Sequence, residues 1–308
     1  MNIILGLLSR ALTMSTPLLF GASSEVIAER SGMMITAIEG IFLMGAWGGF
    51  VGTYYTGSPI LGVLLAMFCG LFLALTYGLI TITMQQNQVV TGAALNLFAG
   101  GFCTFFQRVL FGVPTSPLRI STVSAIELKP FSKIPIIGEI FFKQTVFTYS
   151  LYLLIPAMAY FLYQTSWGLS LRSCGENPVA VDTAGLNITR IRYLAVIFSG
   201  LMGGIAGAFY SIAFLGMFTS NMIGGRGWIA FAICFLGNWT PFGAVIGTFI
   251  FGLAEAIGIY MQSSGSAGII PNEFFIALPY ILTIVLTVAR RKLNVPAQLG
   301  IPYIKEEG

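Results

Sequence analysis

Nine apolar stretches divide the sequence, and most of them are about as long as a helix that crosses a lipid bilayer. They cover residues 3–22, 34–55, 59–80, 89–106, 145–163, 191–215, 228–236, 242–261 and 274–289. About 20 apolar residues in a helix cross the roughly 30 Å of hydrocarbon in a bilayer. Because these runs are continuous and not alternating, they favour a helix bundle over a membrane β-barrel. We therefore expect an all-α integral membrane protein, a polytopic bundle of about nine spans in a single domain over residues 1–308.

The composition agrees with a chain whose main solvent is the lipid bilayer. Of 308 residues, 56% are hydrophobic and 8% are charged, whereas about 25% of the residues in a soluble domain are charged. The net charge is +4, but the basic residues are scattered or lie at segment ends, so no nucleic-acid partner is expected. The four cysteines are far apart, which argues against a disulfide framework or a CxxC metal site.

Basic residues next to the apolar segments predict the topology, because Lys and Arg concentrate in cytoplasmic loops. Arg172, Arg190 and Arg192 flank the connection after the fifth segment, and residues 290–292 are all basic. Both regions are therefore expected on the cytoplasmic side. Nine spans then place the N-terminus and a long loop at about 107–144 outside. The basic residues in that loop oppose this assignment, although long loops follow the rule poorly.

Two of the apolar segments share a pattern that indicates a weak inverted repeat. Ser58-Pro59 with Val63, Gly70, Leu71 and Ala74 matches Thr240-Pro241 with Val245, Gly252, Leu253 and Ala256 at the same offsets. The copies lie in the third and eighth predicted spans, an odd number of membrane crossings apart, so they would cross the membrane in opposite directions, as in transporters built from inverted repeats. A chance alignment of two apolar helices is the alternative.

The connection at residues 168–185 contains the signals for one complete short helix. Asn177 can cap its start, Pro178 suits its first turn, and Gly185 suits the left-handed position just past its end. A helix of about seven residues, over 177–184, is not stable alone in water. It therefore needs a surface to pack against, although an ordinary interfacial connector would have the same signals.

The residues of this connection carry a resemblance to a known family. The pattern Gly-Leu-x-Leu-Arg-x-x-Gly-Glu-Asn-Pro-x-Ala-x-Asp-x-x-Gly resembles the cytoplasmic coupling loop of permease subunits in ABC importers of branched-chain amino acids, ribose and nucleosides. Residues 29–40, 88–96 and 224–237 are similar to the same family, and the simple-sugar and nucleoside branch is most similar. Where that branch more often has an Asn, this chain has Met33-Met34-Ile35-Thr36, so no role of that Asn is carried over.

The resemblance implies a permease subunit of a bacterial cytoplasmic membrane importer that moves nucleosides by alternating access. It also implies three protein partners: an ABC ATPase subunit that binds ATP and Mg, a second permease subunit, and an extracellular solute-binding protein or lipoprotein. The short helix of the coupling loop, at about 167–190, would dock on the ATPase. The implied coupling residues are Arg172, Gly175, Glu176, Asn177, Pro178, Ala180, Asp182 and Gly185. The chain has no G-x-x-x-x-G-K-S/T phosphate loop, so we expect no cofactor and no enzymatic activity in it.

Polar residues inside the apolar segments are the candidates for a substrate pathway. An ionised side chain at the bilayer centre costs roughly 2.5 to 3.5 kcal/mol, so Glu39 and Glu255 should face the bundle interior. Each carboxylate could instead have a structural role, such as capping a helix. Asn96 and Gln88 carry amides, which can form paired hydrogen bonds with a nucleobase. Trp47 could stack on a base, although an aromatic residue is more often simply packed.

Other substrates and another class of transporter fit part of this pattern. A simple sugar such as ribose, or branched-chain amino acids, would use the same architecture. An ion-coupled secondary transporter is the alternative from a different class, but the chain has no His and only two carboxylates inside the predicted spans. No Ser/His/Asp set, HExxH motif or metal cluster indicates a membrane enzyme.

Overall fold

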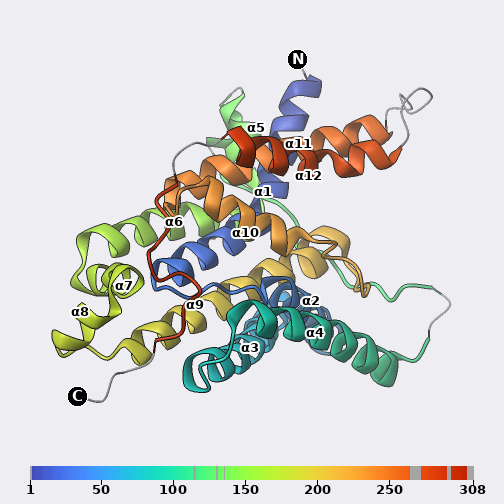
Figure 1. Cartoon of the computed structure of the whole chain (residues 1–308). Coiled ribbons are helices and arrows are strands. Elements are labelled where there is room, and N and C mark those ends of the chain that lie inside the picture. Colours follow the sequence, from blue (N-terminus) through green and yellow to red (C-terminus); the bar gives the residue numbers. More distant parts are fainter. Residues whose placement is uncertain are drawn as a thin grey trace.

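The computed structural model describes residues 2–113, 116–129, 131–134, 136–263, 272–289 and 293–303 (Figure 1). Helices make up most of these residues, and the remaining regular structure is one pair of two-residue strands, which confirms the all-α class. The elements are α1 (Asn2–Arg30), α2 (Ile38–Thr56), α3 (Pro59–Gly78), η1 (Leu79–Thr83), α4 (Gln88–Phe111), β1 (Ile126–Glu127), η2 (Phe131–Lys133), α5 (Ile137–Phe141), β2 (Lys143–Gln144), α6 (Val146–Gln164), α7 (Ser166–Glu176), α8 (Pro178–Thr183), α9 (Ile188–Ala208), η3 (Phe209–Leu215), α10 (Arg226–Leu236), α11 (Pro241–Ser263) and α12 (Asn272–Ala289). The strands β1 and β2 pair in antiparallel fashion.

Six helices in the described part of the chain are long and apolar enough to cross a membrane, so the chain is a multi-pass membrane protein. They are α1, α3 with η1, α4, α6, α9 with η3, and α11. The nine spans predicted from the sequence are not confirmed. One reason is α10, which has 11 residues and a length of about 16 Å, roughly half of the hydrocarbon thickness.

Three boundaries differ from those predicted by hydropathy. The first helix continues past residue 22 to Arg30 and carries Glu25 and Glu29 into the bundle, where both are 0% exposed. The fourth helix continues through Phe111, so the predicted loop at 107–144 begins later. Residues 166–176 form α7, which was not predicted. A segment predicted from hydropathy ends at the first charged or polar residues, whereas tertiary contacts decide whether the helix continues and buries those residues.

Small residues allow the central helices to pack backbone against backbone. A Cβ on Gly45 of α2 would lie 2.5 Å from the carbonyl oxygen of Gly204 in α9, and one on Gly207 would lie 2.0 Å from the carbonyl oxygen of Phe42. On the other side of α9, a Cβ on Gly70 of α3 would lie 2.5 Å from the carbonyl oxygen of Gly200. These glycines therefore form seams along which the helix backbones are in close contact.

The helix ends gather at two opposite ends of the bundle. At one, which we call the α8 end, Arg30 Nε donates to the Trp239 carbonyl (2.9 Å), and Thr83 Oγ1 lies 2.6 Å from Tyr193 Oη. The α7 and α8 helices and the tail at residues 293–303 also lie there (Figure 1). At the opposite end, Ser9 near the start of α1 contacts α5. Which end faces the cytoplasm stays a prediction.

The helices of the proposed repeat, α3 and α11, run in opposite directions. The first ends at the α8 end, near Tyr193, and the second starts there, just after Trp239. Each begins with a proline in its first turn, after Ser58 or Thr240. This is the orientation that an inverted repeat requires.

Candidate functional site

The short helix α8 is built by its own sequence, as its signals predict. Asn177 Oδ1 accepts a hydrogen bond from the Ala180 N–H (3.1 Å) and so caps the first turn, which contains Pro178. Past the end, Gly185 has a φ of +81°, and the Leu186 N–H donates to the Val181 carbonyl (3.2 Å). The helix is therefore terminated on both sides by local hydrogen bonds.

The predicted coupling residues divide into an outward and an inward group. Glu176, Asn177, Ala180 and Gly185 are exposed, and so is Val179, a residue not predicted, which is 60% exposed. Gly175 and Pro178 are buried, and Arg172 and Asp182 are half-buried, so the outward group presents most of the surface that could contact another subunit.

In the inward group, Gly175 has no room for a side chain, because a Cβ there would lie 2.4 Å from the Arg30 carbonyl oxygen. Pro178 is buried. The Arg172 guanidinium lies 5.3 Å from the centre of the Tyr163 ring, a cation–π distance. These residues hold α7 and α8 in place.

The tail at residues 293–303 lies along this region and was missed by the sequence reasoning. The Gln298 N–H donates to the Gly175 carbonyl (2.9 Å), and the Ala297 N–H donates to Glu176 (3.4 Å). Tyr303 Oη donates to Asp182 Oδ2 (3.1 Å). An extended segment with no apolar periodicity gives no local signal of where it packs.

The two amides proposed as ligands, Asn96 and Gln88, bind the backbone between α1 and α2. Asn96 Oδ1 accepts from the Gly40 N–H (2.7 Å) and its Nδ2 donates to the Thr36 carbonyl (2.9 Å). Gln88 is 1% exposed, and its Oε1 accepts from the Met34 N–H (2.7 Å). Segment 31–37 is non-helical and largely buried, so its backbone groups need partners of this kind.

Glu39 caps a neighbouring helix. Its two carboxylate oxygens accept from the N–H groups of Gly225 (2.7 Å) and Gly227 (2.8 Å) at the start of α10. A carboxylate at this position satisfies N–H groups that have no partner within the helix, and it complements the helix dipole. The structure thus shows the capping arrangement that was one of the two alternatives for this residue.

Trp47 lies in an aromatic cluster between α2 and α4. Its ring meets that of Phe102 edge-on, with centres 5.7 Å apart, and lies 6.1 Å from that of Phe106. The indole N–H is buried and finds no hydrogen-bond partner within the residues that the structure describes. Trp47 therefore keeps a free donor, whereas the amides of Asn96 and Gln88 are already engaged.

Glu255 of α11 forms an ion pair with Arg226, a residue that was not predicted. Arg226 Nη2 and Nε lie 2.6 Å and 2.9 Å from Glu255 Oε1, and the guanidinium lies 5.4 Å from the centre of the Tyr210 ring. A carboxylate and a guanidinium inside an apolar bundle stabilise each other by pairing. The sequence signal was present, since an arginine between apolar segments needs a counter-charge.

The carboxylates Glu25 and Glu29 correct the count of two inside the bundle. They lie one turn apart in α1, and Glu29 accepts a hydrogen bond from the indole N–H of Trp239. They were missed because the first span was predicted to end at residue 22. Among the side chains that the structure describes, four carboxylates therefore lie within the helix bundle, so their number no longer argues against an ion-coupled transporter.

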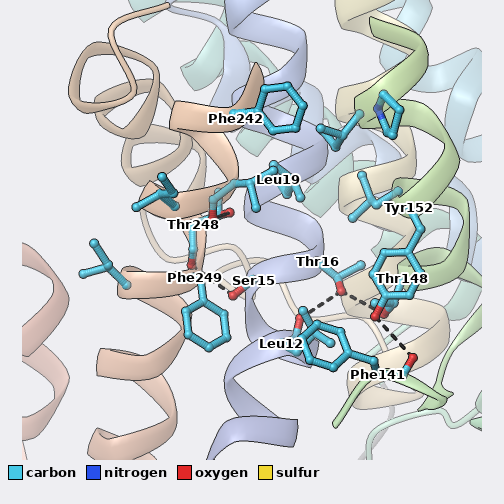
Figure 2. A pocket seen from close by; sticks show the side chains of 16 residues that line it. Leu12, Ser15, Thr16, Leu19, Phe141, Thr148, Tyr152, Phe242, Thr248 and Phe249 are labelled. Carbon is cyan, nitrogen blue, oxygen red and sulfur yellow. Dashed lines mark hydrogen bonds between the residues drawn. The ribbon is translucent and has the colours of Figure 1, made fainter. Parts of the chain in front are cut away.

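A pocket of about 550 Å³ between α1, α6 and α11 is lined almost entirely by apolar side chains (Figure 2). Its hydroxyls are already engaged. Ser15 donates to the Ala11 and Thr248 carbonyls (2.6 Å and 3.0 Å), and Thr16 bonds Thr148 (2.9 Å). Such a wall suits apolar groups and offers little to a polar solute.

A family model and several known proteins match this chain over most of its length. A family model described as branched-chain amino acid transport system / permease component matches residues 7–287. The guanosine ABC transporter permease protein NupQ of Bacillus subtilis is 32% identical over 96% of this chain and 95% of its own. The nucleoside ABC transporter permease protein NupC of Lactococcus lactis is 32% identical over 98% of this chain and 97% of its own. A protein assigned as a glucose ABC transporter permease of Haloferax volcanii is 36% identical over 85% and 80%.

A solved structure supports the fold alone. It shows an inward-facing ABC transporter assigned to the metal-chelate type, with a TM-score of 0.55 and 15% identity over 92% of this chain and 86% of the other. The family match is the stronger finding, since it spans nearly the whole bundle. The chain therefore belongs to the branched-chain amino acid transport system permease family, as do relatives named as ABC transporter permeases.

Proposed function

We propose that this chain moves nucleosides across a bacterial cytoplasmic membrane by alternating access, driven by ATP hydrolysis in a separate ATPase subunit. The observation that carries the proposal is α8, a capped helix of six residues that projects at one end of the bundle. A helix of this length does not persist alone in water, so it depends on the surfaces that hold it. Here the bundle holds one face, and the other face is open to a partner.

The surface around α8 has the character of a docking site for another protein. Val179 (60% exposed), Leu186 (43%) and Trp167 (64%) present apolar groups at this end. Trp167, Leu186 and Arg190 also line a pocket of about 430 Å³. Apolar side chains beside a basic residue suit a protein partner better than water. In the proposal the ATPase binds ATP and Mg, and its closure moves α8.

The proposed substrate is drawn from the names of the relatives, and the remaining partners are those that the coupling-loop resemblance implies. The two relatives named for guanosine or nucleosides match at least 95% of both chains, which favours nucleosides. The Haloferax volcanii relative makes a simple sugar the second candidate. The proposed importer also contains a second permease subunit and an extracellular solute-binding protein or lipoprotein. Coupling to ions is the third possibility to test.

Uptake tests the substrate and the energy source together. Labelled guanosine and uridine are given to cells with and without this chain, with excess ribose or leucine as competitor and a protonophore as control. We expect uptake that needs the chain, resists the protonophore and is blocked only by nucleosides. Competition by ribose or leucine would show that the competitor is the substrate and that the nucleoside assignment is wrong. Loss of uptake with the protonophore while ATP is maintained would refute ATP coupling.

Cysteine labelling tests the ATPase contact. The four native cysteines are at most 8% exposed and give little background. Val179→Cys should react with a maleimide in inside-out vesicles and become protected when the ATPase is bound. Val113→Cys, at a residue that is 83% exposed beyond the end of α4, is the matched control and should stay reactive in detergent with the ATPase bound. Equal labelling of Val179→Cys with and without the ATPase would contradict the docking site.

A further inference from the structure

A polar pocket of about 440 Å³ lies between the loop before α10 and helices α11 and α12; we call it the α10–α12 pocket. Its polar side chains are Asn221, Arg226, Glu255, Gln262 and Tyr280, and apolar residues complete its wall. The volume falls within the range of about 300 to 1,000 Å³ that is common for small-molecule sites. Unlike the pocket of Figure 2, it offers polar groups to a solute.

The charges around this pocket balance one another. Arg226 Nη2 and Nε bond Glu255, and its Nη1 donates to the carbonyls of Met222 (3.3 Å) and Ile223 (3.1 Å). The N–H groups at the start of α10, which could attract an anion, are bound by Glu39. Neither an anion nor a cation therefore gains a free counter-charge here, so the pocket suits a polar solute with no net charge.

Free hydrogen-bonding capacity remains on three side chains. Both bonds from Arg226 reach Glu255 Oε1, and no described residue bonds Glu255 Oε2. The amides of Asn221 and Gln262 likewise have no partner among the described residues, and both residues are exposed. A carboxylate oxygen accepts bonds from hydroxyls, whereas an amide both donates and accepts. The ring of Tyr280, 42% exposed, borders the pocket, with its Oη bonded to the Gly224 carbonyl (2.6 Å).

The pocket lies where the bundle is interrupted. Residues 216–225 are not helical, and α10 starts at Arg226 and reaches the α8 end 11 residues later. At 1.5 Å per residue this length is about 16 Å, which puts Arg226 near the middle of a bilayer core of about 30 Å. Non-helical backbone at that depth occurs only where it is buried or lines a cavity, and transporters bind solutes at such breaks.

We propose that the α10–α12 pocket binds the transported nucleoside, with Glu255 accepting hydrogen bonds from the ribose hydroxyls and with Asn221 and Gln262 bonding the edge of the base. The inference rests on the proposed function. It explains why Arg226 pairs with one oxygen of Glu255 and no other described residue bonds the second, since that oxygen is left for the sugar. It also explains how one site accepts several bases, because amides can donate to some and accept from others.

Binding to the purified complex of permease and ATPase, without the solute-binding protein, tests this site. Displacement of labelled guanosine gives the Kd of guanosine and of 2′,3′-dideoxyguanosine, which lacks both ribose hydroxyls. A hydrogen bond to a charged group is worth about tenfold or more in Kd. The wild type should therefore bind guanosine at least about tenfold more tightly, and Glu255→Gln should reduce this ratio to about threefold or less.

The ratio of the Kd of 2′,3′-dideoxyguanosine to that of guanosine distinguishes a lost contact from a damaged fold, because misfolding weakens the binding of both ligands alike. Glu127→Gln, the same substitution at an exposed carboxylate, should keep the wild-type ratio. Asn221→Ala and Gln262→Ala leave the Arg226 pair intact and should change the preference between guanosine and uridine by about tenfold, with the ribose ratio unchanged. Unchanged ratios in all three pocket variants, or no binding to the wild type, overturn the inference. The uptake experiment judges the proposed function separately, since it does not depend on these variants.

Discussion

Replacing Glu39 by Gln should lower the stability of the bundle, because this carboxylate holds the start of α10. Its two oxygens accept from Gly225 (2.7 Å) and Gly227 (2.8 Å), and it is the one side chain among the described residues that bonds both N–H groups. The substitution keeps the shape and the first acceptor. The second oxygen becomes an NH₂ group, which then faces an N–H donor.

The size of the effect follows from these contacts. A hydrogen bond to a charged group contributes about 1.5 to 3 kcal/mol, a neutral one about 1 kcal/mol, and a buried unpaired donor costs about 1 to 3 kcal/mol. Two charge-assisted bonds, together about 3 to 6 kcal/mol, are replaced by one neutral bond of about 1 kcal/mol, which gives a decrease of about 2 to 5 kcal/mol in the free energy of unfolding. With about 2 °C of Tm per kcal/mol for a chain of this size, Tm should fall by about 4 to 10 °C.

The assay is thermal unfolding in detergent, followed by size-exclusion chromatography of the soluble fraction. Glu127→Gln is the matched control, because Glu127 pairs with Lys143 (3.3 Å) and half of its side chain is exposed, at 51%. Such surface pairs contribute about 1 kcal/mol or less, so its Tm should change by about 2 °C at most. An unchanged Tm in Glu39→Gln would refute the capping argument. If uptake were lost at the same time, Glu39 would act on the substrate instead.

Three further predictions concern the helix α8, the close contacts at glycines and the cysteines. The double variant Asn177→Ala and Asp182→Ala should reach the membrane at wild-type abundance, because losing the cap of α8 costs only about 1 kcal/mol. It should nevertheless lose ATP-driven uptake, and unchanged uptake would refute the role of α8 in coupling. Gly207→Ala should lower Tm more than Gly100→Ala, because its Cβ would lie 2.0 Å from a backbone oxygen, whereas nothing lies within 4 Å of the other; equal Tm values would contradict close packing. Burial raises the pKa of the Cys174 thiol, so it should react more slowly with maleimide at pH 8 than Val179→Cys; equal rates would show that it is accessible.

Patterns short enough to be local were predicted well. The all-α class and the short helix with its caps at Asn177 and Gly185 match the structure. Caps and turns depend on neighbouring residues, so their signals are complete in the sequence. The resemblance identified the family, because the coupling-loop pattern spans 18 consecutive positions, at 168–185.

Partnerships between distant residues could not be predicted. Asn96 and Gln88 were proposed as substrate ligands, yet their amides bind the backbone of segment 34–40. Arg226 was not proposed, although it pairs with Glu255 across 29 positions. A polar residue in an apolar segment shows that a partner must exist, but it does not say which one.

The sequence by itself determined that this chain crosses a membrane as helices, where the short helix α8 lies, and to which family it belongs. These properties follow from hydropathy, local hydrogen bonds and a contiguous motif, each of which is written within a short stretch of the chain. Only the tertiary structure decided that Glu39 caps α10, that Glu255 pairs with Arg226, and that the tail lies along α8. Those outcomes depend on which helices pack together, because a buried polar group bonds to whichever partner the packing brings within reach.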